Sequence, residues 1–418
     1  MTSPHTSAPD RGEGAPAGIE AEERHASWLE LFFDLVAVAG VAQLAHRLHE
    51  AADWRDGAAY LGLFLAFWIA WVTFTMYASV AAETVRYRTM YLAMFGMATM
   101  AACVPEATGE RGTVFAAAFV LIRLLSSRVW GARGEAVVDW PTAQLALGMI
   151  PWIVSLWLEG PWRYGMWGLG LALDILLPFA VSGDRLLANF GRAADQRRER
   201  YANVEFKGGE RGRQRKAQLG QPPRLVRLEA GHFDERLGLF TIIVLGEGVV
   251  QLVAQTASVE DWNNVLAISC AAFVLLICLW RLTFRYGFTG VPHVSLSTAS
   301  ARVVLPAHFA TTAALTAVAA GLGELAVHPG APASTVTRWT LCAGLGCYFL
   351  IAAIGGLIGG ASGVWLTLWS WPGLLLCVGL GLFAKGMDPV LLVWLLNAVL
   401  LWSCSYEQVR RRTRTGTA

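Results

Sequence analysis

Charged residues are scarce in this chain. Only 15% of its 418 residues are Asp, Glu, Lys or Arg, whereas 55% are hydrophobic and 18 are tryptophan. A soluble globular domain carries charge on about a quarter of its residues, so this composition excludes an ordinary water-soluble protein. It predicts an all-α polytopic membrane protein built as a bundle of transmembrane helices, with most tryptophans at the membrane interfaces.

Motifs for disulfides, metals and secretion are also absent from the sequence. The seven cysteines form no CxxC pair and lie in or beside apolar runs, so we interpret them as small core residues. There is no HExxH motif, so we assign no metal, and nothing specifies a cofactor or an oligomeric state. Residues 1–27 lack the apolar segment of a signal peptide, and we expect a disordered cytoplasmic tail there.

About twelve apolar stretches are long enough to cross a bilayer, which needs about 20 residues. The first six are Trp28–Leu48, Ala58–Val80, Arg88–Val104, Gly112–Trp130, Pro141–Leu158 and Trp162–Ser182. The other six are His232–Ala254, Asp261–Phe284, Ala301–Val327, Arg338–Ile358, Gly363–Ala384 and Met387–Gln408. The first of these spans is expected to serve as its own insertion signal.

A long basic segment divides the spans six and six. We predict a first membrane half at 28–182, a basic cytoplasmic loop at 183–231, a second membrane half at 232–408 and a basic cytoplasmic tail at 409–418. Because Lys and Arg accumulate on the cytoplasmic side, this charge pattern places both termini in the cytoplasm. Attraction to anionic membrane lipids accounts for the basic residues, and we expect no nucleic acid partner.

Short segments of the two halves resemble each other. GVAQL at Gly40–Leu44 and GVVQL at Gly248–Leu252 fall at similar places in the first and seventh spans. Six helices per half preserve the direction of the chain, so the match predicts two parallel halves unless it is a coincidence.

Ionisable side chains at the starts of the first and seventh spans are candidate binding residues. Glu30 and Asp34 are four residues apart and share a helix face, where two carboxylates repel unless a cation, a proton or an arginine lies between them. His232, Glu235 and Arg236 occupy the corresponding place in the seventh span. The alternative is that these are helix-start charges, with His232 and Glu235 paired locally. The four acidic and histidine side chains would suffice for a divalent metal, but no second histidine stands at metal-ligand spacing.

Glu247 is the main candidate because it lies deeper in the seventh span. It is about 22 Å from His232 at 1.5 Å per residue, so we expect its partner to come from another helix. Arg123 in the fourth span is the preferred partner, and Asp174 and His308 are the other deep ionisable groups. Such side chains face a bundle interior or a cavity, where they serve function or a structural network.

Two long segments carry a family resemblance. WLELFFDLVAVAGVAQLAH at Trp28–His46 and HFDERLGLFTIIVLGEGVV at His232–Val250 resemble the hallmark segments of the bacterial low temperature requirement protein A family. Arg123, Asp174 with Pro178, and LPAH at Leu305–His308 support the resemblance. It implies a multi-span bacterial inner-membrane protein, and it implies no particular biochemical activity.

This chain departs from the family pattern at two places. After Phe74–Ala78 it reads SVAAETVRYR where members usually carry an acidic run, and Thr283–Arg285 ends on a base where members commonly have an acid. These departures mark a divergent member that has lost carboxylates.

Two functions from different classes fit these residues. In the main prediction, a transport or channel protein, Glu247 with Arg123 and Asp174 binds an ion, a proton or a small solute, and Glu247→Gln abolishes flux. In the alternative, an intramembrane enzyme acts on a lipid or isoprenoid, for example by proton-initiated cyclisation, with Glu247 or Asp174 as the general acid. A third possibility is a membrane scaffold without chemistry.

Overall fold

The structure is a computed structural model of the chain. It describes residues 26–81, 84–133, 135–137, 140, 146–180, 192, 195–196, 199–200, 224–226, 228–257, 262–285, 291 and 293–415. Almost all of the predicted N-terminal tail and most of the predicted loop at 183–231 lie outside the described residues.

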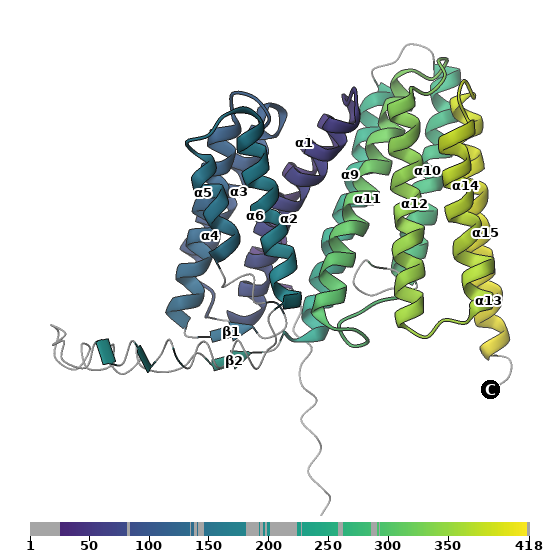
Figure 1. Cartoon of the computed structure of the whole chain (residues 1–418). Helices are drawn as coiled ribbons and strands as arrows, with labels where there is room; N and C mark the ends of the chain where they lie inside the picture. The colour runs from purple at the N-terminus through teal and green to yellow at the C-terminus, as the bar shows by residue number, and fades with distance from the viewer. Residues whose placement is uncertain are drawn as a thin grey trace, which may run out of the picture.

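The described residues form a helical bundle with one small pair of strands (Figure 1). The helices of the first half are α1 (Trp28–His49), α2 (Trp54–Ala81), α3 (Tyr87–Cys103), α4 (Gly112–Arg133), α5 (Met149–Ser155) and α6 (Gly160–Ala180). Those of the second half are α9 (Ala230–Ala257), α10 (Trp262–Arg285), α11 (Ala301–Val327), α12 (Thr335–Ile358), α13 (Gly363–Trp365), α14 (Trp371–Phe383) and α15 (Pro389–Thr415). The prediction of an all-α membrane bundle is confirmed.

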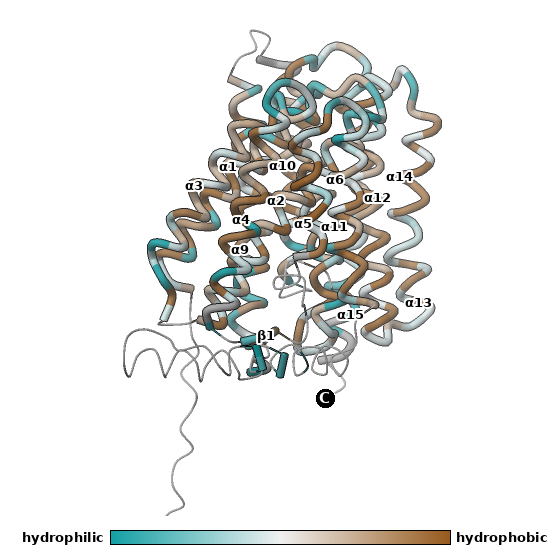
Figure 2. Tube along the Cα trace, turned by 60° about the vertical axis from the view of Figure 1, so that its left-hand side comes forward, coloured by the Kyte–Doolittle hydropathy of each residue, from teal (hydrophilic) through white to brown (hydrophobic). Residues whose placement is uncertain are grey.

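Nine helical segments within the described residues are long and apolar enough to cross a membrane. They are α1, α2, α4, α9, α10, α11, α12, the combined α13 to α14 segment and α15. Hydrophobic residues run along most of the length of these helices (Figure 2). The other three predicted spans correspond to α3, α5 and α6. None of these three helices is both long enough and apolar enough to be among the nine.

The fifth predicted span is shorter than the sequence suggested. A 3₁₀ turn at Ala146–Gly148 precedes α5, which has seven residues, and residues 141–145 lie outside the described part of the chain. Gly160, with φ of 56°, forms the turn into α6, a conformation that glycine adopts without strain. The expectation of one helix over Pro141–Leu158 is therefore wrong in the described residues.

Two helices near the C-terminus also differ from the predicted spans. A π-helical turn at Leu366–Ser370 joins α13 to α14, directly before Pro372, which lacks the N–H group of a regular helix. The last helix continues to Thr415 and includes most of the predicted basic tail at 409–418.

Helix α1 occupies the centre of the bundle. It packs against α2, α3, α9 and α11, and α2 in turn packs against α4 and α6 (Figure 1). Gly40 permits this close packing, because a Cβ atom there would collide with the Phe67 ring of α2. Because α1 also packs against α9, the first and seventh predicted spans are in contact.

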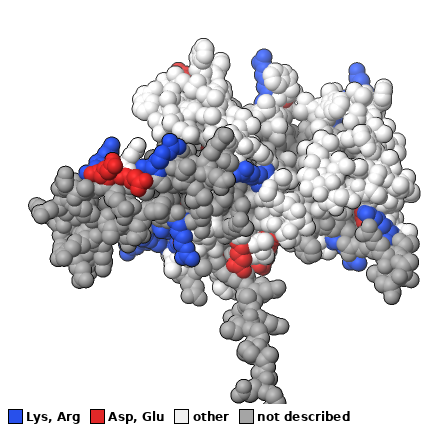
Figure 3. Space-filling model, turned by 60° about the horizontal axis from the view of Figure 1, so that its bottom comes forward, with Lys and Arg blue, Asp and Glu red and all other residues white. Residues whose placement is uncertain are grey.

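One end of the bundle carries the strands and the C-terminal part of α15, at the bottom of Figure 1. Strand β1 (Glu135–Val137) pairs in parallel with β2 (Arg224–Val226), with Ala136 opposite Leu225. On this face the described Lys and Arg side chains are more numerous than the Asp and Glu side chains (Figure 3).

Candidate functional site

Four buried ionisable side chains meet where α1 contacts α9. Glu30 and Asp34 come from the first turns of α1, and His232 and Arg236 from the first turns of α9. All four are buried. We call them the quartet. The sequence predicted all four as binding residues, and the structure places them together.

Helix capping positions the acidic half of the quartet. The Ser27 side chain accepts a hydrogen bond from the Glu30 N–H, and the Glu30 carboxylate accepts one from the Ser27 N–H at 2.7 Å. This reciprocal pair is a capping box, which satisfies backbone groups at a helix start. It holds Glu30 with Oε1 at 3.8 Å from His232 Nε2.

Asp34 and Arg236 form the tightest contact in the quartet. The Arg236 guanidinium donates to Asp34 Oδ1 at 2.7 Å, and both side chains are 0% exposed. The indole N–H of Trp71 in α2 donates to the same oxygen at 2.8 Å. Of the three alternatives for the two carboxylates of α1, a cation, a proton or an arginine, the structure shows an arginine at Asp34.

Several buried polar atoms of the quartet have no hydrogen-bond partner among the residues that the structure describes. They are Asp34 Oδ2, Arg236 Nε and Nη1, and both ring nitrogens of His232. Buried polar groups are nearly always hydrogen bonded, and exceptions mark catalytic or ligand-binding positions or places where a water or ion binds. The quartet therefore has hydrogen-bonding capacity for a ligand.

The quartet itself contains two carboxylates, one guanidinium and one imidazole. Side chains of these types bind and release protons and cations inside membrane helices.

His308 in α11 lies next to the quartet but is fully hydrogen bonded. Trp68 N–H donates to Nδ1 at 3.0 Å, so the proton of the neutral ring lies on Nε2, 3.0 Å from the Leu237 carbonyl. The ring stacks on Trp71, with centroids 5.7 Å apart. This geometry ties α2, α9 and α11 together and supports Trp71, the partner of Asp34.

Arg123 and Asp174 form a second buried ion pair. Arg123 in α4 donates to Asp174 Oδ1 in α6 at 2.9 Å. Asp174 fits over Gly148, where a Cβ atom would collide with the carboxylate. The expectation that Arg123 pairs with Glu247 is wrong, because Arg123 bonds to Asp174 and Glu247 bonds to Gln251.

Glu247 takes its partner from its own helix. Gln251 Nε2, one turn further along α9, donates to Glu247 Oε1 at 2.9 Å, and Glu247 is half-buried. The expectation of a partner from another helix is therefore wrong. A glutamate and a glutamine four residues apart lie on the same helix face, which makes this local bond available.

The other acidic residues near the start of α9 lie around the quartet. Glu235 is half-buried, and the alternative that His232 pairs with Glu235 is replaced by the contact of His232 with Glu30. Asp234, which the sequence analysis did not select, accepts two contacts of 3.1 and 3.2 Å from the Leu296 N–H.

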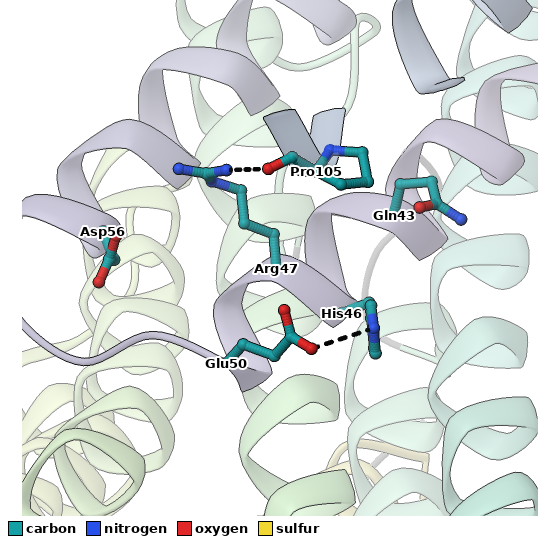
Figure 4. Close-up of a pocket in the computed structure, with 6 residues that line it drawn as sticks. All are labelled: Gln43, His46, Arg47, Glu50, Asp56 and Pro105. Carbon is teal, nitrogen blue, oxygen red and sulfur yellow. Dashed lines mark hydrogen bonds and ion pairs between the residues drawn. The ribbon is translucent and has the colours of Figure 1, made fainter. Parts of the chain in front are cut away.

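A polar pocket of about 160 Å³ lies at the other end of α1 (Figure 4). Its lining residues are Gln43, His46, Arg47, Glu50, Asp56 and Pro105. Arg47 donates to the Pro105 carbonyl at 2.8 Å, and His46 lies 3.5 Å from Glu50 (Figure 4). The separation of Asp34 and Arg47 by thirteen residues amounts to roughly 20 Å along the helix.

The quartet fixes the direction of α1 relative to α9. Glu30 contacts His232 and, four residues on, Asp34 contacts Arg236, so the two helices run parallel with an offset of 202 residues. Parallel helices are what the predicted repeat requires. The motifs at Gly40 and Gly248 differ by 208 positions, however, and so are displaced by about six residues, roughly 9 Å, from this register. Superposition of the two halves stays a prediction.

Comparison with known proteins places the chain in a family. Residues 25–404 match the family described as bacterial low temperature requirement A protein. This chain belongs to that family. The two segments that carry the resemblance form α1 and α9, so the hallmark regions of a low temperature requirement A protein meet at the quartet.

A curated relative is an uncharacterized protein of Rhizobium meliloti (strain 1021), which is 24% identical over 276 residues. The match covers 64% of this chain and 60% of the relative's length. No solved structure matches the chain.

Trp68 and Trp71 are the partners that sequence analysis missed. Tryptophan is common at membrane interfaces, and the first prediction placed most of them there. Both lie instead near the middle of a 28-residue helix and are fully buried. Their distance from either end of α2 is the signal that could have identified them as interior hydrogen-bond donors.

Proposed function

We propose that this low temperature requirement A protein carries protons across the membrane through the quartet of Glu30, Asp34, His232 and Arg236. The observation that carries the proposal is the set of buried polar atoms on Asp34, His232 and Arg236 that have no hydrogen-bond partner among the described residues. Ionisable groups inside membrane helices mark proton relays and ion pathways. Histidine is the side chain that most readily exchanges a proton in the physiological pH range.

The position of the quartet supports a pathway along α1. The polar pocket around Arg47 lies at one end of this helix and the quartet at the other. We place the quartet at the cytoplasmic side of the inner membrane, with both termini in the cytoplasm, because basic residues predominate at this end. In this orientation the Arg47 pocket is the external opening.

The test is proton uptake by vesicles containing the full chain. Protein is reconstituted in liposomes that enclose a pH-sensitive dye, and a potassium diffusion potential drives proton entry. The native protein accelerates acidification, and His232→Gln slows it about tenfold, which corresponds to roughly 1.4 kcal/mol in the barrier. Enclosing a sodium-sensitive dye in place of the pH-sensitive dye, with sodium outside, asks whether a monovalent cation moves instead.

His49→Gln is the matched control variant. His49 lies in the same helix and contacts Glu324 of α11 at 3.1 Å, outside the quartet. We expect proton uptake by this variant at the native rate. Native uptake by His232→Gln would overturn the proposal, and loss of uptake only in Glu247→Gln would transfer the site to Glu247.

The intramembrane enzyme remains an alternative proposal with less support. An apolar cavity of about 690 Å³ between α2 and α12 has neither Glu247 nor Asp174 in its lining, so neither proposed general acid faces it. The test is mass spectrometry of lipid extracts from cells expressing the protein, where a new product that depends on Glu247 or Asp174 would favour the enzyme.

A further inference from the structure

An apolar groove with a volume of about 690 Å³ lies between α2 and α12, with residues of α11 between them. Ligand pockets for small molecules fall in the same range, about 300 to 1,000 Å³. The groove exists because alanine and glycine line it: Ala310, Ala313 and Ala317 on α11, and Ala343 and Gly344 on α12. Small side chains leave space that Leu or Phe would fill.

The interior of the groove offers no free hydroxyl at Tyr60. The Tyr60 O–H donates to the Ala313 carbonyl at 2.7 Å, and this tyrosine is buried. Binding of an apolar ligand therefore removes no water from an unpaired phenol hydroxyl and does not incur that desolvation cost.

The length of the groove matches one leaflet of a bilayer. On α12 its lining extends from Thr335, the first residue of the helix, to Cys347. Twelve residues at 1.5 Å each give about 18 Å. Half of a hydrocarbon core of about 30 Å is about 15 Å. The groove thus runs from the membrane interface at the C-terminal end of α1 to about the bilayer centre.

The mouth of the groove has the residues of a membrane interface. Trp54 is 77% exposed and lines the mouth, and the Arg55 guanidinium lies 5.8 Å from the centre of its ring. This cation–π contact keeps a positive charge at the level of lipid headgroups. The neighbouring carboxylates are engaged locally, since Asp53 accepts from the Arg55 N–H at 2.7 Å and Asp56 accepts from the Ala52 N–H at 2.9 Å.

From this arrangement we infer that the groove binds one acyl chain of a phospholipid, with the lipid phosphate at Arg55. The lipid comes from the leaflet at the C-terminal end of α1. Its apolar chain matches the alanine-lined interior, and its phosphate matches the guanidinium, a preferred phosphate donor. The site is separate from the quartet and does not depend on proton transport.

The test is photolabelling of the full chain in vesicles of phosphatidylethanolamine and phosphatidylglycerol. A trace of phosphatidylglycerol carries a diazirine halfway along one acyl chain, and labelled peptides are mapped by mass spectrometry after irradiation. We expect labelling at Ala310 to Ala317 and Ala343 to Cys347 several times above that at Leu375, which is exposed on α14. Equal labelling at the groove and at Leu375 would overturn the inference.

Two glycines of α2 give a matched pair of variants. A Cβ atom at Gly57 or at Gly62 meets no atom within 4 Å, but only Gly57 lines the groove. Gly57→Leu fills the groove and should reduce groove labelling several-fold, whereas Gly62→Leu should leave it unchanged. Unchanged labelling of Gly57→Leu would contradict the inference.

The phosphate contact is tested separately with Arg55→Gln. This variant should weaken labelling by the phosphatidylglycerol probe and leave labelling by an isoprenoid diazirine without phosphate at its native level. Stronger groove labelling by the isoprenoid than by the phospholipid in the native protein would overturn the assignment of the ligand as a phospholipid.

Discussion

Asp34 and Arg236 show how a single residue depends on its partner in this bundle. Both side chains are fully buried, and each neutralises the charge of the other. Removal of one member leaves an uncompensated charge, which is costlier than removal of both. The stability of the quartet is therefore a property of the pair.

We predict that Arg236→Gln lowers the free energy of unfolding by about 3 to 5 kcal/mol, because the Asp34 carboxylate remains buried without its guanidinium partner. The double variant Asp34→Asn with Arg236→Gln should lose less than the single variant. Thermal unfolding in detergent measures both. Equal losses for the single and double variants would show that the two charges do not interact.

The hydrogen bonds of His308 give a second prediction. Trp68→Phe removes the donor to His308 Nδ1 and leaves a buried acceptor unpaired, which costs about 1 to 3 kcal/mol. The control is Trp28→Phe, because Trp28 is 88% exposed at the start of α1. Its effect should stay within about 0.5 kcal/mol in the same unfolding measurement. A similar loss in both variants would contradict the structural role of Trp68.

The sequence was sufficient to select the ionisable residues of the site but not all of their partners. The spacing of four residues between Glu30 and Asp34, and between His232 and Arg236, places each pair on one face of its helix. The partner of Arg123 depends on which helices are neighbours and how each is rotated. The sequence pattern of a single helix shows neither its neighbours nor its rotation. Asp174 was therefore identified as a deep ionisable residue but not as the partner of Arg123.

At the scale of helices, glycine determines how closely α1 and α2 approach. The ring of Phe67 occupies the space where a Cβ atom of Gly40 would lie, whereas Gly62 faces open space. The sequence predicts helices from apolar length, but it does not show which glycine lies in a contact. The same limit explains α5, where the length of an apolar run gave no indication of the preceding 3₁₀ turn.

We predict opposite effects for alanine at these two glycines of the first half. Gly40→Ala should destabilise the protein by about 1 to 3 kcal/mol through overpacking against Phe67. Gly62→Ala should stabilise it by roughly 0.5 to 1 kcal/mol, because alanine loses less backbone entropy in a helix. Unfolding in detergent compares them, and a stabilised Gly40→Ala variant would contradict the packing of α1 on α2.

For the molecule as a whole, the position of α1 joins the two membrane halves. It contacts α2 and α3 of its own half and α9 and α11 of the other. Apolar composition and basic connections predicted a multi-span bundle, which is confirmed. The sequence analysis placed charged residues at corresponding positions of α1 and α9, and the structure brings the two helices into contact. Nine segments of the described residues, fewer than the twelve predicted, have the length and apolarity of a membrane span.

The predicted orientation can be checked by cysteine labelling from the two sides of the membrane. Asp53 and Arg412 are exposed at opposite ends of the bundle. In a cysteine-free background, a membrane-impermeant maleimide should label Asp53→Cys in intact spheroplasts and Arg412→Cys only in inverted vesicles. The predicted topology has a cytoplasmic C-terminus and an odd number of membrane crossings between these two positions. Labelling of both cysteines from the same side would contradict it.

The offset of 202 residues between Asp34 and Arg236 has a consequence for biosynthesis. At about 5 to 20 residues per second, the ribosome synthesises that much chain in about 10 to 40 s. During this interval α1 has emerged and its carboxylates have no guanidinium partner from α9. The carboxylates of α1 must therefore stay hydrated or protonated until α9 arrives, so the quartet begins with the first helix and is completed by the seventh predicted span.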